Sequence, residues 1–135
     1  MPGFFTDLAN NKILDLVFGA VDYTPPPTLY VGLATNASNK SGLVTEPSGG
    51  GYARVPIANN TTNFPVSVGG TKSNAVQVSF SSPTASWGTI QSIFVADAAT
   101  GGNVLAMADL ATPRAMISGS AAAQVAVGAL FLSHT

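Results

Sequence analysis

The sequence predicts an all-β fold: a compact antiparallel sandwich or barrel of about seven strands, preceded by one N-terminal α-helix. Two observations predict this class. From residue 28 onward, short segments with alternating apolar and polar residues follow one another, and turn-forming glycine, proline and asparagine residues separate them. By contrast, only residues 6–19 show the spacing of an amphipathic helix.

The predicted helix at residues 6–19 has signals at both ends. Thr6 can cap the first turn, Asp7 suits the positive end of the helix dipole, and Gly19 can end the helix. The three prolines at residues 25–27 prevent the helix from continuing. Its apolar side chains gather on one side: Leu8, Ile13, Leu14, Val17 and Phe18.

The strands are predicted where apolar residues recur at every second position or form a short buried run. Pro56 predicts an edge strand or a bulge, because proline cannot donate a ladder hydrogen bond. Two glycines within residues 97–103 predict a hairpin, and Pro113 predicts the end of the strand that follows it. The predicted strands are residues 28–35, 52–58, 74–81, 89–96, 104–110, 115–117 and 124–132.

The composition restricts the function. The chain has five basic and six acidic residues, 8% in all, and a net charge of −1, whereas soluble domains average about 25% charged residues. Because hydrophobic residues make up a normal 46%, disorder is disfavoured, and five scattered basic residues cannot form a nucleic-acid footprint. No apolar run is long enough to span a membrane and no secretory signal is visible, so we expect one domain, residues 1–135, made in a cytoplasm.

No catalytic or metal-binding constellation is visible. The only histidine is His134, close to the C-terminus, and there is no cysteine. None of the six carboxylates forms a pair with the spacing of a glycosidase or a metal loop. Asp97 and Asp109 flank the hairpin and could form a calcium site, but a turn-initiating Asp97 and a solvent-facing Asp109 are the more ordinary interpretations. We therefore expect a protein that is not an enzyme and has no cofactor.

Aromatic and basic residues supply the candidate interface: Phe4, Phe5, Tyr52, Arg54 and Trp87. Residues 1–5 are a possible N-terminal arm whose two phenylalanine rings dock on a neighbour, or else cover this chain's own helix. Tyr52 and Trp87 suit stacking on a sugar or a partner, although aromatic residues at strand entries more often serve as core or subunit-interface anchors.

Four stretches resemble a family of tailed-bacteriophage virion proteins that are labelled either head decoration (cement) proteins or tail-fibre-like proteins. They are residues 11–19 followed by 23–26, residues 28–35 with Thr45 and Glu46, residues 50–55 followed by 63–65 and 72–74, and residues 85–90 leading to 97–103. The resemblance implies a small β-rich structural protein without catalytic residues. Because tail fibres are usually long modular trimers and this chain has no shaft, the cement role is the favoured expectation.

As a cement protein, the chain is expected to bind the outer capsid surface as a homotrimer and to stabilise contacts between subunits of the major capsid protein. The alternative is a tail-fibre or baseplate component that binds host-surface glycans through Trp87 and Tyr52. An enzyme that uses His134 is the third and most remote hypothesis.

Overall fold

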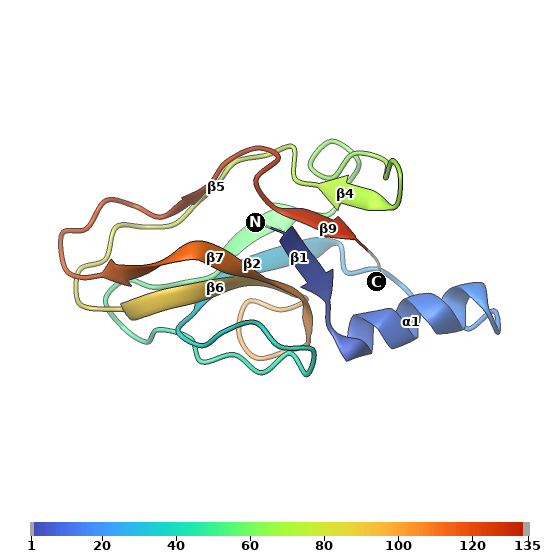
Figure 1. Cartoon of the computed structure of the whole chain (residues 1–135), viewed down its shortest axis with the longest axis horizontal. Helices are drawn as coiled ribbons and strands as arrows, with labels where there is room; N and C mark the ends of the chain where they lie inside the picture. Colours follow the sequence, from blue (N-terminus) through green and yellow to red (C-terminus); the bar gives the residue numbers. More distant parts are fainter. Residues whose placement is uncertain (1, 134–135) are drawn as a thin grey trace.

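The structure is a computed structural model that describes residues 2–133, and most of its regular elements are strands (Figure 1). Seven strands form one sheet in the order β3-β2-β6-β7-β1-β9-β4, and β5 and β8 form a separate two-stranded sheet. The large sheet curls into a half-barrel, which confirms the predicted all-β class with one helix. The elements are β1 Pro2–Phe5, α1 Asp7–Val17, β2 Thr28–Ala34, β3 Val55–Ala58, β4 Thr71–Ser73, β5 Val78–Ser79, β6 Gly88–Ala96, β7 Val104–Met116, β8 Gln124–Val125 and β9 Phe131–Ser133.

The first strand, β1, corrects the expectation of a projecting arm at residues 1–5. Pro2–Phe5 lie inside the large sheet, where Phe4 pairs with Met107 of β7 on one side and with Ser133 of β9 on the other. Met1 lies outside the described residues. The β1–β9 pair is parallel, so the sheet is mixed rather than wholly antiparallel. A strand of four residues is too short to show a clear alternation of apolar and polar residues. Its partners lie in the last third of the chain, so no neighbouring segment indicates the pairing either.

The helix α1 confirms the predicted start and most of the predicted extent. The Ala9 amide donates to Thr6 Oγ1 (3.5 Å), and the Thr6 hydroxyl donates to the Val104 carbonyl (2.7 Å), which ties the cap to β7. The helix ends where the Phe18 amide donates to the Leu14 carbonyl and Gly19 adopts a φ of +132°. Ala9 is its only buried residue, so the apolar side of the helix is not covered by the sheet.

The two central strands, β2 and β6, separate two apolar layers, as their alternation predicts. Val31 and Leu33 lie in the larger cluster, whereas Ala34 lies with Phe94 in a smaller cluster on the opposite face. Gly32 faces the Phe94 ring, and a Cβ there would overlap the ring, so glycine allows this close packing. The β3 edge position predicted from Pro56 is confirmed, since β3 pairs only with β2.

The longest strand, β7, differs from the prediction. Residues 104–110 and 115–117 are not two strands ended by Pro113, because β7 runs from Val104 to Met116. A bulge lies opposite Gln91, where Ile90 pairs with Arg114 and Ser92 with Asp109. Pro113 falls within that bulge, where no ladder amide is needed, so it does not end the strand.

The remaining strands are shorter than predicted. Within residues 74–81 only β5 is a strand, and residues 124–132 divide into β8 and β9 rather than forming one buried strand. Asn74 explains the division. Its side-chain Nδ2 donates to the carbonyls of Val76 and Ala126, and its side-chain Oδ1 accepts from the Leu130 backbone amide. These bonds hold a turn between β8 and β9. The β5–β8 sheet then completes the larger apolar cluster through Val78, Phe80 and Val125.

Candidate functional site

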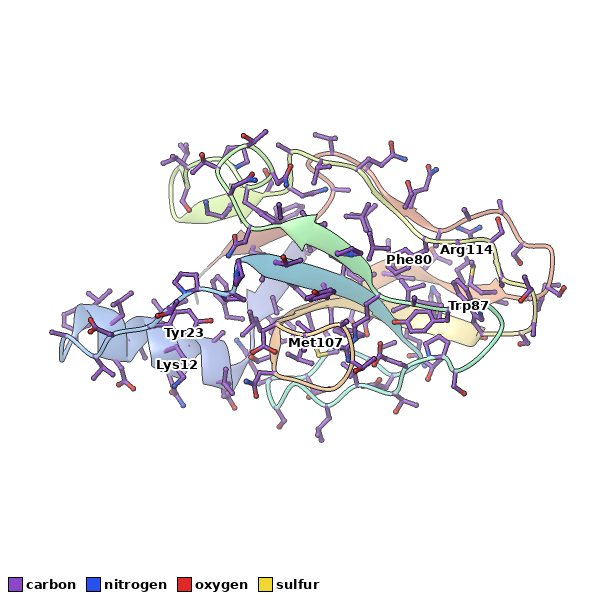
Figure 2. All side chains as sticks on the ribbon, turned by 180° about the vertical axis from the view of Figure 1, so that it is seen from behind. Lys12, Tyr23, Phe80, Trp87, Met107 and Arg114 are labelled. Atoms are coloured by element: carbon purple, nitrogen blue, oxygen red, sulfur yellow. The ribbon has the colours of Figure 1, made fainter. Side chains whose placement is uncertain are left out.

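Three of the five candidate interface residues come together inside the chain. Tyr52, Arg54 and Trp87 form one network with Glu46, a residue that the sequence pattern did not single out as a partner. Trp87 lies toward the end of the molecule opposite α1 (Figure 2). The network connects the long loop before β3 with the strand entry at β6 and with the β6–β7 hairpin.

Arg54 is the centre of this network. Its guanidinium binds both carboxylate oxygens of Glu46 (Nε to Oε1 2.9 Å, Nη2 to Oε2 2.7 Å) and donates from Nη1 to the carbonyls of Ala98 (2.7 Å) and Gly101 (2.9 Å). It also lies 4.9 Å from the centre of the Phe94 ring. The Arg54 side chain is only 4% exposed. Arg54 therefore fixes the predicted hairpin at residues 97–103 to the body of the sheet.

Tyr52 and Trp87 form the second half of the network. Their rings meet edge to face at 5.3 Å, and Trp87 is 3% exposed. The Trp87 indole donates to the Gly50 carbonyl (3.0 Å), and Gly50 has a φ of +59° that favours glycine. The Tyr52 hydroxyl donates to Glu46 Oε1 (2.8 Å) and accepts from the Leu33 amide (3.0 Å). Both aromatic residues therefore serve as anchors within one chain, and a partner role for them stays a prediction.

The network shifts three pKa values, and the hydrogen bond with Glu46 raises that of Arg54. Partial burial of the Glu46 carboxyl opposes ionisation, but the hydrogen bonds from Arg54 and Tyr52 outweigh it and lower the pKa of Glu46 below its ordinary value of 4.5. Burial of the phenol, with the neighbouring Glu46 carboxylate, raises the pKa of Tyr52 above its usual range. Tyr52 therefore stays protonated and remains a donor to a carboxylate that stays ionised.

A pH titration of stability tests this assignment. Because the folded pKa of Glu46 is lowered, its contribution is present above the ordinary value of 4.5 and is lost as the pH falls through the folded pKa. We expect Glu46→Gln to be less stable than the wild type at pH 7, and the gap to close as the pH falls through the folded pKa of Glu46. The measurement is urea unfolding followed by circular dichroism across this range. A gap that is independent of pH would contradict the assignment.

The other two candidates, Phe4 and Phe5, point to opposite faces of β1. Phe4 packs against the smaller apolar cluster, and Lys40 Nζ lies 4.7 Å from the centre of its ring. Phe5 packs against the larger cluster. Adjacent residues of a strand face opposite sides of the sheet, so the two rings cannot dock together on a neighbour as an arm.

The acidic residues around the hairpin accept hydrogen bonds from groups of the chain itself. Asp97 accepts from the amide and side chain of Asn103, whereas Asp109 accepts from the Ser38 amide. Within residues 2–133, no group of three potential metal ligands occurs. His134 lies outside the described residues.

Two apolar surfaces beside α1 were not identified from the sequence. The first, called the helix stripe below, consists of the exposed residues Leu14, Val17, Phe18 and Val21. The second is an open groove of about 400 Å³ over the sheet, called the α1 groove because α1 borders its adjoining part; its apolar lining includes Phe5, Leu29, Phe64, Leu105 and Leu132. Ile13 and Lys12 of α1 border its adjoining part. The residue spacing of the helix predicted an apolar side, but not that it would remain exposed.

Comparison with known families adds one finding. The family model described as Podophage GP4 fiber I protein gp80 matches residues 4–133. The chain belongs to this family. Membership of the gp80 family makes the chain a structural component of a tailed-phage virion, as the resemblance implied, and the fibre label agrees with one of the two labels considered above. A comparison with curated proteins finds no match.

The gp80 family match covers every strand and the helix, apart from the first two residues of β1. It therefore includes the Arg54 network, the helix stripe and the α1 groove. Among the described residues, no helix is both long and apolar enough to cross a membrane.

Proposed function

We propose that the chain is a head-decoration (cement) protein, which binds the outer capsid surface as a homotrimer and stabilises contacts between subunits of the major capsid protein. The role is structural and requires no catalytic group or cofactor. A clamp of this kind works by adding buried interface that is lost only when several subunits separate together.

The observation that supports this proposal best is the contrast between buried and exposed apolar residues. The aromatic residues suited to sugar stacking, Tyr52 and Trp87, are held in the internal network. The residues of the helix stripe, Phe18 above all, are exposed. Exposed apolar patches rimmed by polar residues are typical of protein–protein contacts. The low charge of the chain also favours contacts of this kind, because few charged groups have to be desolvated.

The second candidate is a fibre component, which the printed description of the gp80 family favours. The glycan-binding version of this hypothesis depends on an accessible Trp87, and a side chain that is 3% exposed offers almost no ring face to a sugar. A fibre protein that attaches through protein contacts is consistent with the same surfaces. The two candidates therefore differ in where the chain sits on the particle.

Cryo-electron microscopy of the virion, together with particles that lack this chain, tests the proposal. We expect density for the chain at threefold or quasi-threefold positions of the head. Particles without it should release DNA at a lower temperature, and purified protein added back should restore the release temperature. Density only on the tail, with unchanged DNA release and reduced adsorption to host cells, would support the fibre candidate and overturn the cement role.

A further inference from the structure

The helix stripe is an unusual feature for a helix in a single chain. Leu14, Val17 and Phe18 recur at the three- and four-residue spacing that places side chains on one side of a helix, and Phe18 is 79% exposed. Figure 1 shows α1 extending beyond the edge of the sheet. A helix of 11 residues is shorter than the roughly 12–15 residues at which an isolated helix becomes even marginally stable in water. We therefore expect the helix to be stabilised when another surface covers its exposed apolar side.

The α1 groove has the complementary shape and polarity. It is open and apolar, and its volume of about 400 Å³ falls within the roughly 300–1,000 Å³ of typical ligand pockets, enough for several side chains. None of the four stripe residues lines it. Ile13 borders the adjoining part of the groove and lies one helical turn before Val17, so the stripe continues from the rim of the groove and stays exposed rather than seated in the groove of the same chain.

The charges at the two surfaces are opposite. The exposed carboxylates Asp15 and Asp22 adjoin the stripe, whereas the basic residue that lines the groove is Lys72. Lys72 donates to the carbonyls of Phe64 and Pro65. The one ion pair within residues 2–133 is Arg54–Glu46, so Asp15, Asp22 and Lys72 can still pair with charges on another molecule.

From these three observations we propose that copies of this chain associate head to tail, with the helix stripe of one copy seated in the α1 groove of the next. A contact between two different surfaces of identical chains either closes into a ring or continues as a filament. The inference rests on the homo-oligomer in the proposed function and names the surfaces that form it, so that three such contacts close the trimer. The apolar side chains supply the buried area, and the opposite charges set the orientation.

Sedimentation velocity of the full purified chain tests the proposal without any capsid. We expect a wild-type oligomer at micromolar concentration. Phe18→Glu, which places a charge in the stripe, and Lys72→Glu, which reverses the charge at the groove, are each expected to raise the dissociation constant at least tenfold. Ile117→Glu is the matched control: Ile117 is also exposed, and it directly follows β7 at the end of the molecule away from α1 (Figure 1), so this variant should associate like the wild type. Circular dichroism confirms that each variant is folded.

Mixing the two variants distinguishes a head-to-tail contact from a symmetric one. Phe18→Glu keeps an intact groove and Lys72→Glu keeps an intact stripe, so an equimolar mixture should form heterodimers and nothing larger. If Lys72→Glu alone associates like the wild type, the groove is not the receptor and the proposal is wrong. A wild-type chain that stays monomeric, yet binds another virion protein through the stripe, would also overturn it. That result would leave the proposed function standing, whereas loss of head density would not affect the oligomer in solution.

Discussion

Replacing Arg54 with Met is expected to destabilise the chain by about 2–3 kcal/mol, because the change removes the charged partner of Glu46, whose side chain is 25% exposed while that of Arg54 is 4% exposed. Methionine keeps much of the length of the side chain but leaves the Glu46 carboxylate without its two guanidinium bonds. It also leaves the carbonyls of Ala98 and Gly101 without the Nη1 donor. The measurement is the free energy of unfolding in urea at pH 7, which reports the whole cooperative transition.

Arg114 provides a matched control for this experiment. It is exposed, and its side chain donates to a single carbonyl, that of Ala121. Arg114→Met should therefore change the free energy of unfolding by less than about 1 kcal/mol. Combining Arg54→Met with Glu46→Gln should cost less than the sum of the two single changes, because the second change removes the unpaired charge. Equal losses for the two arginine variants would mean that the Glu46 pair does not hold the fold.

Replacing Trp87 with Ala is expected to destabilise the chain by about 3–5 kcal/mol, the range found for removing a large aromatic side chain from a core. The change removes the edge-to-face contact with Tyr52 and the donor to the Gly50 carbonyl. Trp87 is the only tryptophan in the chain. The intrinsic tryptophan fluorescence of the wild type therefore reports whether the Trp87 indole is buried, and its emission maximum should shift to longer wavelength on unfolding.

Two further variants separate packing from hydrogen bonding at this position. Trp87→Phe keeps most of the ring but not the indole donor, so its cost should be about 1–2 kcal/mol. Val127→Ala, at an exposed site, should stay within about 0.5 kcal/mol of the wild type. A Trp87→Ala variant that keeps wild-type stability but loses binding to carbohydrate would contradict the internal placement and restore the glycan hypothesis.

The parts of the fold that the sequence predicted are those fixed by local signals. The Thr6 cap and the alternation in β2 depend on neighbouring residues, so both could be identified without the structure. The errors arose where contacts between distant parts of the chain determine where a strand begins or ends. Pro113 looks like a strand end, but the β6–β7 bulge accommodates it. Asn74 divides the C-terminal apolar run by bonding to residues more than 50 positions away, and no local pattern reveals such bonds.

The residue types of the candidate site could be predicted, but not whether their side chains face the interior of the chain or a partner. Tyr52 and Trp87 were predicted as interface candidates and lie in an internal network, since an aromatic side chain suits a core and an interface equally well. Glu46 was missed as the partner of Arg54 because seven residues of loop lie between them and only the folded loop brings them together. The exposed side of α1 could not be foreseen either, since an amphipathic pattern shows that a face is apolar without showing which surface covers it.

The position of β1 in the large sheet has a consequence for synthesis. β1 is made first, but both of its neighbours, β7 and β9, come from the last third of the chain. Until those segments have left the ribosome, Phe4 and Phe5 have no sheet to join, and the apolar surface that they later cover stays open. Long-range pairing of this kind slows folding and leaves aggregation-prone intermediates with exposed apolar surface. The large sheet is therefore expected to close only after β7 and β9 have left the ribosome, and rapid overexpression, which raises the concentration of incomplete chains, should favour aggregation over soluble protein.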